Sequence, residues 1–155
     1  ICYCGCMHFD PAVLLRDKGI YVTAPRVAAL RVVHSHPHAT ADDVLQAVTD
    51  EIGAVSRQSI YDTLNTLTEL GLLRRIQPPD SAARYETRIN DNHHHLMCRG
   101  CTLVIDIDCA VGERPCLTAS ESHDFIIDEA EVVYWGYCPS CQKDLNITTP
   151  SHTFN

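Results

Sequence analysis

Four of the nine cysteines form two C-x-x-C pairs, Cys98 with Cys101 and Cys138 with Cys141. A spacing of two residues lets both thiolates of a pair face one ion, and two pairs complete the tetrahedral sulfur set that suits Zn²⁺. Because 36 residues separate the pairs, a shared ion would join distant parts of one domain. A closed four-cysteine site has no open position for a substrate, so we expect a structural ion. Disulfides or a thioredoxin-type redox motif are the alternatives.

The remaining cysteines fit neither pair. Cys109 and Cys116 are interpreted as small buried hydrophobic residues, with redox thiols as the alternative. Cys2, Cys4 and Cys6 alternate in a segment that begins with Ile. A metal-binding tail and an irregular start of the chain both stay open for this segment.

Three consecutive histidines, His93, His94 and His95, precede the first cysteine pair. On a strand, His93 and His95 would share one face and His94 would lie on the other, because side chains alternate with a period of two. Asp106 and Asp108 follow on the next strand-like segment. We therefore expect a second site in this region.

Two residues of the first half could extend this histidine and carboxylate set, namely His38 and Glu86. A mixed set of imidazoles and carboxylates suits Fe²⁺, Mn²⁺ or Zn²⁺ better than a thiophilic ion. Adjacent histidines are more commonly solvated surface, but the neighbouring cysteine pair favours the ligand interpretation.

The elements that must position these residues begin with four short helices. Helix-capping residues and breakers predict their limits: starts after Asp10, Thr23, Thr40 and Ser56, and ends near Gly19, His36, Gly53 and Gly71. In the fourth helix, Ile60, Leu64 and Leu67 form the buried stripe. Off that stripe lie Arg57, Gln58, Tyr61, Asp62 and Asn65.

After these helices, LLRRI and ARYETRI flank the turn-prone PPDSA and predict a hairpin. Helices followed by a hairpin are typical of a winged helix-turn-helix, which reads DNA with its last helix and follows phosphates with its wing. Wing candidates are Arg74, Arg75, Arg84 and Arg88, and the full set of predicted DNA contacts is Arg26, Ser56, Arg57, Gln58, Tyr61, Asn65, Arg74 and Arg84. A small helical bundle with solvated arginines is the alternative.

The second half predicts strands over HHHLM, TLVIDI and EVVYWGY, with a short helix between Leu117 and His123. The fold class is therefore α+β, with an N-terminal winged helix-turn-helix domain and a C-terminal mixed α/β dimerisation domain. We expect an irregular N-terminal extension over residues 1–9, the DNA-binding domain over 10–88, the metal-binding dimerisation domain over 89–145 and a flexible tail over 146–155.

The balance of charged residues also differs between the two predicted domains. Lys and Arg number nine against ten Asp and Glu up to Asn90, a balance of −1, and three against ten beyond it, a balance of −7. This asymmetry is expected of a nucleic-acid module joined to a cation-binding one. The sequence has no run of about 18 apolar residues, so no membrane-spanning helix is expected. The opening ICYCGC does not resemble a secretory signal. A reducing, cytoplasmic location follows as an expectation.

The order of these segments resembles the ferric uptake regulator (Fur) family. The resemblance is carried by SRQSIYDTLNTLTELGLL, ARYET, NHHHLMCRGC and YWGYCPSC, and runs from about Pro11 to Cys141. In detail the sequence is most similar to the actinobacterial FurA or CatR subgroup, which is associated with peroxide response and catalase genes.

The resemblance implies site residues position by position. Cys98, Cys101, Cys138 and Cys141 correspond to structural zinc ligands, and His38, Glu86, His93, His95 and Asp106 to a regulatory site for Fe²⁺ or Mn²⁺. Family members often carry Glu at the last position. Aspartate there resembles the peroxide-sensing branch, in which bound iron(II) reacts with peroxide and oxidises a histidine ligand, here His38 or His93.

Departures from the family pattern modify these expectations. His94 and Glu113 match two positions of a third family site, but Asn92 and Ala130 occupy the others, so a complete third site is not expected.

The recognition helix departs as well, because the family commonly shows Tyr-Arg where this chain has Tyr61-Asp62. An aspartate repels phosphates but can accept from a cytosine amino group, so the operator is expected to differ from the usual family sequence. Tyr61 is predicted to contact a thymine methyl group, and Arg57 a guanine or a phosphate.

The resulting function is a homodimeric, metal-dependent repressor that binds a near-palindromic double-stranded operator, and not an enzyme. Alternatives are a zinc- or iron-sensing repressor without peroxide chemistry, a zinc hydrolase, a dithiol oxidoreductase and a zinc storage protein. No HExxH-like spacing supports a hydrolase.

Overall fold

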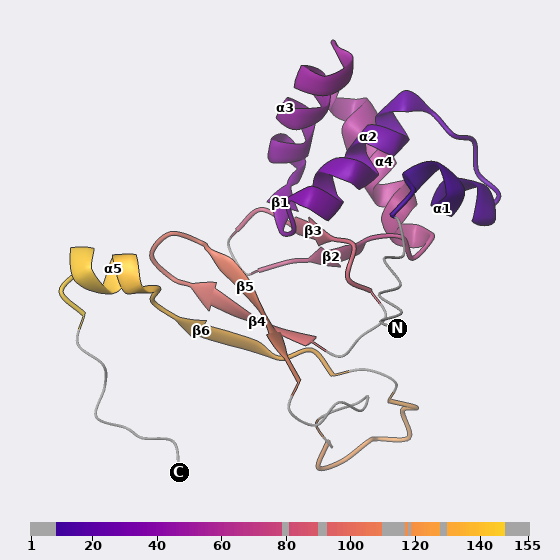
Figure 1. Ribbon diagram of the computed structural model, residues 1–155. Helices are drawn as coiled ribbons and strands as arrows, with labels where there is room; N and C mark the ends of the chain where they lie inside the picture. Colours follow the sequence, from indigo (N-terminus) through magenta and orange to yellow (C-terminus); the bar gives the residue numbers. More distant parts are fainter. Residues whose placement is uncertain are drawn as a thin grey trace, which may run out of the picture. The chain divides into compact units, whose positions relative to one another are not determined.

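The structure is a computed structural model that describes residues 9–78, 81–89, 93–109, 117, 119–127 and 130–147. The chain divides into two compact units, residues 1–89 and 90–155 (Figure 1). Helices and short sheets make up both, so the predicted α+β class is confirmed. Among the described residues, no helix is long and apolar enough to span a membrane.

The first unit contains four helices, each beginning at the capping residue that the sequence indicates. They are α1 (Pro11–Asp17), α2 (Ala24–Ser35), α3 (Ala41–Ile52) and α4 (Arg57–Glu69). The Ser56 hydroxyl accepts the backbone N–H of Ser59 at 3.1 Å and so starts α4. Thr40 and Asp43 form a reciprocal capping box at the start of α3.

Helices α2, α3 and α4 pack around a single apolar core. Each contributes side chains spaced three or four residues apart, which therefore share one helix face. Fully buried members are Leu30, Val33, Val44, Val48, Ile60, Leu64 and Leu67. Burial of each such side chain stabilises the unit by roughly 1.5–3 kcal/mol, and it turns the polar face of α4 outward.

A three-stranded antiparallel sheet completes the first unit. Its strands are β1 (Ala39–Thr40), β2 (Arg74–Ile76) and β3 (Arg84–Glu86), in the order β1-β3-β2. Strands β2 and β3 are the predicted hairpin. Tyr85 in the middle of β3 is buried in the core, so its neighbours Arg84 and Glu86 lie on the opposite face of the strand. Strand β1 was not predicted, because two residues cannot display an alternating pattern.

The second unit is built on a mixed sheet. Its elements are β4 (His93–Cys98), β5 (Val104–Asp108), β6 (Val133–Gly136) and the helix α5 (Pro139–Asp144). In the order β5-β4-β6, β4 pairs antiparallel with β5 and parallel with β6. The three strands expected from the sequence are therefore present.

One predicted element is wrong. The described residues at 117 and 119–123 form bends and a turn instead of a short helix. The segment has no apolar stripe to bury, and His123 and Asp124 adopt positive φ angles of 47° and 62°, which a helix does not allow. Asn92, Glu113, Cys116, the cysteines at positions 2, 4 and 6 and the tail beyond residue 147 lie outside the described residues.

The capping box of α3 gives a first prediction. Thr40 donates its hydroxyl and its backbone N–H to the Asp43 carboxylate at 2.6 and 2.8 Å, and these bonds lower the pKa of Asp43. We expect Thr40→Val to reduce the free energy of unfolding by about 1 kcal/mol at neutral pH, measured by urea denaturation.

Thr40→Ser, which keeps the hydroxyl, is the control and should unfold like the wild type. Because the pKa of Asp43 is lower in the folded protein, its ionised carboxylate stabilises the fold at pH values above the pKa of an unfolded Asp. This stabilisation is lost as the pH falls through the pKa of the folded protein. The difference between Thr40→Val and wild type should therefore shrink in acid. An equal difference at all pH values would contradict the role of the ionised Asp43.

Candidate metal centre and nucleic-acid interface

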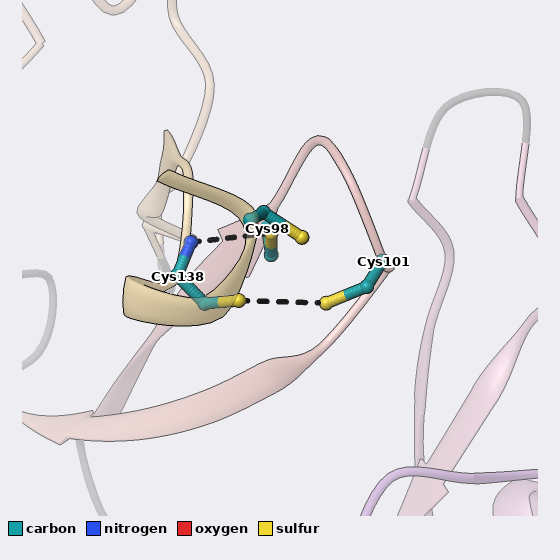
Figure 2. A group of neighbouring side chains, drawn as sticks. Cys98, Cys101 and Cys138 are labelled. Carbon is teal, nitrogen blue, oxygen red and sulfur yellow. Dashed lines mark hydrogen bonds between the residues drawn. The ribbon is translucent and has the colours of Figure 1, made fainter. Parts of the chain in front are cut away.

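The four cysteines of the C-x-x-C pairs meet at one end of the second unit's sheet, and Figure 2 shows three of them, Cys98, Cys101 and Cys138. Cys98 ends β4, and parallel pairing of β4 with β6 sets it opposite Gly136. The chain then leaves β6 directly into Cys138, the N-cap of α5, which also carries Cys141. All four sulfur atoms lie within 4.8 Å of one another.

The sulfur spacing fits a tetrahedral ion. Cys101 Sγ and Cys138 Sγ are 3.6 Å apart, whereas zinc–sulfur bonds of about 2.3 Å place neighbouring sulfurs of a tetrahedron about 3.8 Å apart. A disulfide would need about 2.05 Å, and all four cysteines are free thiols. The structure therefore contains no disulfide among these four cysteines, and the donor set suits Zn²⁺.

The local electrostatics also call for a cation. The backbone N–H of Cys138 donates to Cys98 Sγ at 3.2 Å, and with further backbone donors it lowers the pKa of Cys98 to about 6. The neighbouring Cys138 side chain, followed by burial, raises the pKa of Cys141 to about 12. One thiol ionises readily and another resists, so the four can be thiolates together only around a positive ion.

Gly100 has a specific packing role inside the first pair. A Cβ atom at this position would lie 2.7 Å from Cys141 Sγ and 3.0 Å from Cys141 Cβ. The sequence suggests that glycine eases the turn between Cys98 and Cys101. The structure adds a second reason, because only hydrogen leaves room for the opposite cysteine.

A second donor group lies on one face of the same sheet. Antiparallel pairing sets His95 opposite Asp106 and His93 opposite Asp108. Asp106 Oδ1 lies 3.7 Å from His95 Nε2 and 3.9 Å from His93 Nε2. His94 belongs to the other face, where its ring meets the Tyr134 ring at 6.5 Å. The alternation expected from the sequence thus brings two imidazoles and one carboxylate together.

In the first unit, His38 and Glu86 form a pair. His38 Nε2 lies 3.2 Å from Glu86 Oε2. The backbone holds His38 in place: its N–H donates to Tyr85 O at 2.8 Å and its carbonyl accepts from Arg84 Nη1 at 3.0 Å. Its φ of 67° lies in the left-handed region, a strained conformation for a residue with a Cβ.

The outer face of α4 carries the predicted reading residues. Arg57, Gln58, Tyr61, Asp62 and Asn65 are all exposed, opposite the buried stripe. Two of them are held by carboxylates that sequence reasoning did not connect to them. The Arg57 guanidinium donates to Asp42 at the start of α3, and Gln58 Nε2 donates to Asp62 Oδ1 at 2.7 Å.

The other predicted DNA contacts surround this helix. Arg26 lies in the first turn of α2, donates to Tyr21 O at 2.9 Å and lines a groove shared with Ser56 and Gln58 of the α4 start. Arg74 lies on β2 of the wing. The hydroxyl of Ser56 is already used as the cap of α4. Arg84 has a structural task as well, since it binds the His38 carbonyl.

A sequence model of the ferric uptake regulator family matches residues 17–134. The chain belongs to the ferric uptake regulator family. The matched range contains Cys98 and Cys101, the histidine and carboxylate residues described above, α4 and the β2–β3 hairpin. Cys138 and Cys141 lie beyond it.

Named relatives agree with this membership. Ferric uptake regulation protein 1 of Mycolicibacterium fortuitum is 57% identical over 89% of this chain and 85% of its own length. Transcriptional regulator FurA of Mycobacterium tuberculosis is 52% identical over 92% of this chain and 96% of its own. The peroxide-responsive repressor PerR of Staphylococcus aureus is 30% identical over 83% and 86%. This Fur-family chain is therefore a transcriptional regulator.

Solved structures of the family share its fold. The Vibrio cholerae ferric uptake regulator superposes with a TM-score of 0.68 at 23% identity, covering 83% of this chain and all of that one. The Pseudomonas aeruginosa regulator, solved with manganese, gives 0.66 at 25% identity and covers 83% and 98%.

Gly100 provides the test of the cysteine site in this Fur-family protein. We expect Gly100→Ala to weaken Zn²⁺ binding roughly 10- to 100-fold, because the new methyl group displaces Cys141 Sγ. A chelator competition with a chromophoric zinc indicator measures the affinity. Gly136→Ala is the matched control, since its Cβ would meet no atom within 4 Å. Equal zinc retention in both variants would count against the close packing of the four sulfurs.

Proposed function

We propose that this protein is a metal-dependent repressor that binds operator DNA as a homodimer and releases it when its regulatory ion is lost. The observation that carries the proposal is the distribution of donors. Each compact unit holds an incomplete set of histidine and carboxylate ligands, and the first unit also presents a reading helix and a wing. An ion that needs both sets would link metal binding to DNA binding.

The four cysteines are proposed to hold a structural Zn²⁺. Bound there, the ion supplies no reaction chemistry and fastens the end of β4 to α5. Because the four sulfurs fill a tetrahedron, no position stays open for hydrolysis. This argues against the zinc hydrolase, and the free thiols at 3.6 Å argue for a metal site before a redox dithiol.

The regulatory site is proposed to comprise His38 and Glu86 from the first unit and His93, His95 and Asp106 from the second. Neither set alone provides the five or six ligands that Fe²⁺ or Mn²⁺ commonly takes. Nitrogen and oxygen donors without sulfur suit these ions. The family member from Pseudomonas aeruginosa solved with manganese supports the same choice.

Strand β3 is the mechanical link in this proposal. It carries Glu86, a proposed ligand, and Arg84, a proposed DNA contact, two residues apart on one face. His38 pairs with the same strand and leads through β1 into α3. Asp42 at the start of α3 in turn binds Arg57 on the reading helix. A ligand that moves would therefore move both DNA-contacting elements.

The ion can shift this equilibrium only by binding the DNA-competent arrangement more tightly than the other. A coupling free energy of about 2–3 kcal/mol would tighten operator binding about 30- to 150-fold.

The homodimer is supported by an apolar face on the second unit's sheet. Pairing sets Leu96 beside Ile105 on one side and Tyr134 on the other. Their exposed fractions are 38%, 48% and 50%, which leaves a contiguous apolar surface across three strands. A second copy covering this face by a two-fold axis would present two reading helices to a near-palindromic operator.

Peroxide sensing is proposed as the regulatory input. Asp106 at the last ligand position resembles the peroxide-sensing branch. The similar PerR protein of Staphylococcus aureus is named a peroxide-responsive repressor. An iron(II) ion held by these residues would supply the electron with which the O–O bond of peroxide breaks, so that one oxygen leaves as hydroxide and the other is added to a histidine ring. In this chain, His38 and His93 are the residues proposed to gain oxygen, after which they bind metal less well. Control of catalase or iron genes follows from the resemblance.

Fluorescence anisotropy with an operator duplex tests the metal switch. We expect Mn²⁺ to raise the affinity of zinc-loaded wild type about 30- to 150-fold at fixed salt. His38→Gly should lose this gain while keeping the fold, since glycine adopts a φ of 67° without strain. His123→Gly is the matched control, because His123 also has a positive φ and is not a proposed ligand. Operator binding that ignores Mn²⁺ would refute the switch.

Mass spectrometry tests the peroxide input. After peroxide treatment of the iron(II) form, we expect one added oxygen atom on His38 or His93, and none in the manganese form. Asp106→Glu should keep metal-dependent DNA binding and lose most of the oxidation. If the wild-type iron(II) protein gains no oxygen on either histidine, peroxide sensing is refuted and the protein is a repressor that responds to metal alone.

A further inference from the structure

The outermost side chains of α4 include a hydrogen-bonded pair, Gln58 and Asp62. Both are exposed, and they lie opposite the stripe of Ile60, Leu64 and Leu67 that is fully buried. Gln58 Nε2 donates to Asp62 Oδ1 at 2.7 Å. The pair is therefore part of the surface that a major groove would meet if α4 is the reading helix.

The hydrogen bond fixes the orientation of the Gln58 carboxamide. One N–H of the amide is used by Asp62, which leaves the second N–H and the carbonyl oxygen for another partner. Rotating the amide by half a turn would set its carbonyl against the Asp62 carboxylate, which is repulsive. Asp62 thus presents Gln58 in a single donor–acceptor order.

That order matches one base. A glutamine reads adenine with two bonds, its carbonyl accepting from the N6 amino group and its amide donating to N7. The negative charge of Asp62 adds a second preference, because it attracts the amino groups of adenine and cytosine. It repels guanine, whose major-groove edge carries only acceptors, and thymine, which offers the acceptor O4 and no donor. Cytosine offers an amino group but no N7 acceptor beside it. The combined preference is adenine.

We propose that Gln58 and Asp62 act as one unit that selects adenine at a single position of each operator half-site. Gln58 contacts the base, and Asp62 is a positioning residue that orients Gln58 and repels competing bases. The inference rests on the proposed DNA-binding function and adds a base identity to it. It also explains how an aspartate on a DNA-binding face is used in spite of its repulsion from phosphates.

Helix α3 contains a matched pair without this role. Gln46 Nε2 donates to Asp50 Oδ1 at 2.9 Å, and both residues are exposed. The spacing and chemistry equal those of Gln58 and Asp62, and such pairs modestly stabilise a helix. Any effect that comes from helix stability alone should therefore appear equally at Asp50 and at Asp62.

The experiment selects bound duplexes from a library randomised over one operator half-site, using the zinc-loaded full chain with Mn²⁺. Wild type, Gln58→Ala, Asp62→Asn and Asp50→Asn are compared by sequencing. Wild type should prefer adenine at one position. Gln58→Ala should lose roughly 5- to 100-fold of discrimination there and keep the preferences elsewhere.

Asp62→Asn should weaken the adenine preference at the same position and raise the affinity for unrelated duplexes, because one negative charge is gone. Asp50→Asn should match the wild type in both readouts. An adenine preference that survives both α4 substitutions would overturn the inference, as would a preference for cytosine that depends on Asp62 alone. No duplex binding by any protein would instead refute the proposed function, which keeps the two failures distinct.

Discussion

In the proposed function, the second unit depends on one cation that offsets the mutual repulsion of four thiolates. Its apolar interior is small, with Met97 and Val104 as buried aliphatic side chains of its described residues, so little packing holds its sheet together. An ion bound by Cys98, Cys101, Cys138 and Cys141 would join β4 to the start of α5. It would supply stabilisation that larger domains obtain from a larger apolar core. The antiparallel register of β4 against β5 brings His95 and His93 to Asp106, and an ion at the cysteines would hold the end of this sheet together.

The first unit is organised around β3. Its three residues divide their side chains between the core and the opposite face, so that Tyr85 anchors the strand while Arg84 and Glu86 both contact His38. His38 is held to this strand by its backbone N–H, which donates to Tyr85 O, and by the Arg84 guanidinium, which donates to the His38 carbonyl, in a conformation that costs free energy. Such a residue is expected where position matters more than stability. In the proposed mechanism this geometry makes the wing and the regulatory ligands one mechanical element.

Much of this could be predicted from the sequence, because local rules operate over a few residues. Capping residues and apolar periodicity located α2, α3 and α4, and the period of two separated His94 from its neighbours. Contacts between distant residues could not be found in this way. The pairing of Arg57 with Asp42 joins two helices, and the closeness of Gly100 to Cys141 arises only when the two cysteine pairs meet. The short helix expected near residue 120 is absent because its one large apolar residue, Leu117, is 58% exposed and gives the segment no buried stripe.

In the proposed mechanism, the regulatory ion and the operator favour the same arrangement of the protein. Thermodynamic linkage then requires that DNA tightens metal binding by the same factor by which metal tightens DNA binding. Isothermal titration of Mn²⁺ into the zinc-loaded protein, with and without a saturating operator duplex, measures this factor directly. Mn²⁺ should bind about 30- to 150-fold tighter in the presence of the duplex. Equal Mn²⁺ affinity in both titrations would contradict it, whatever the affinity of either ligand alone.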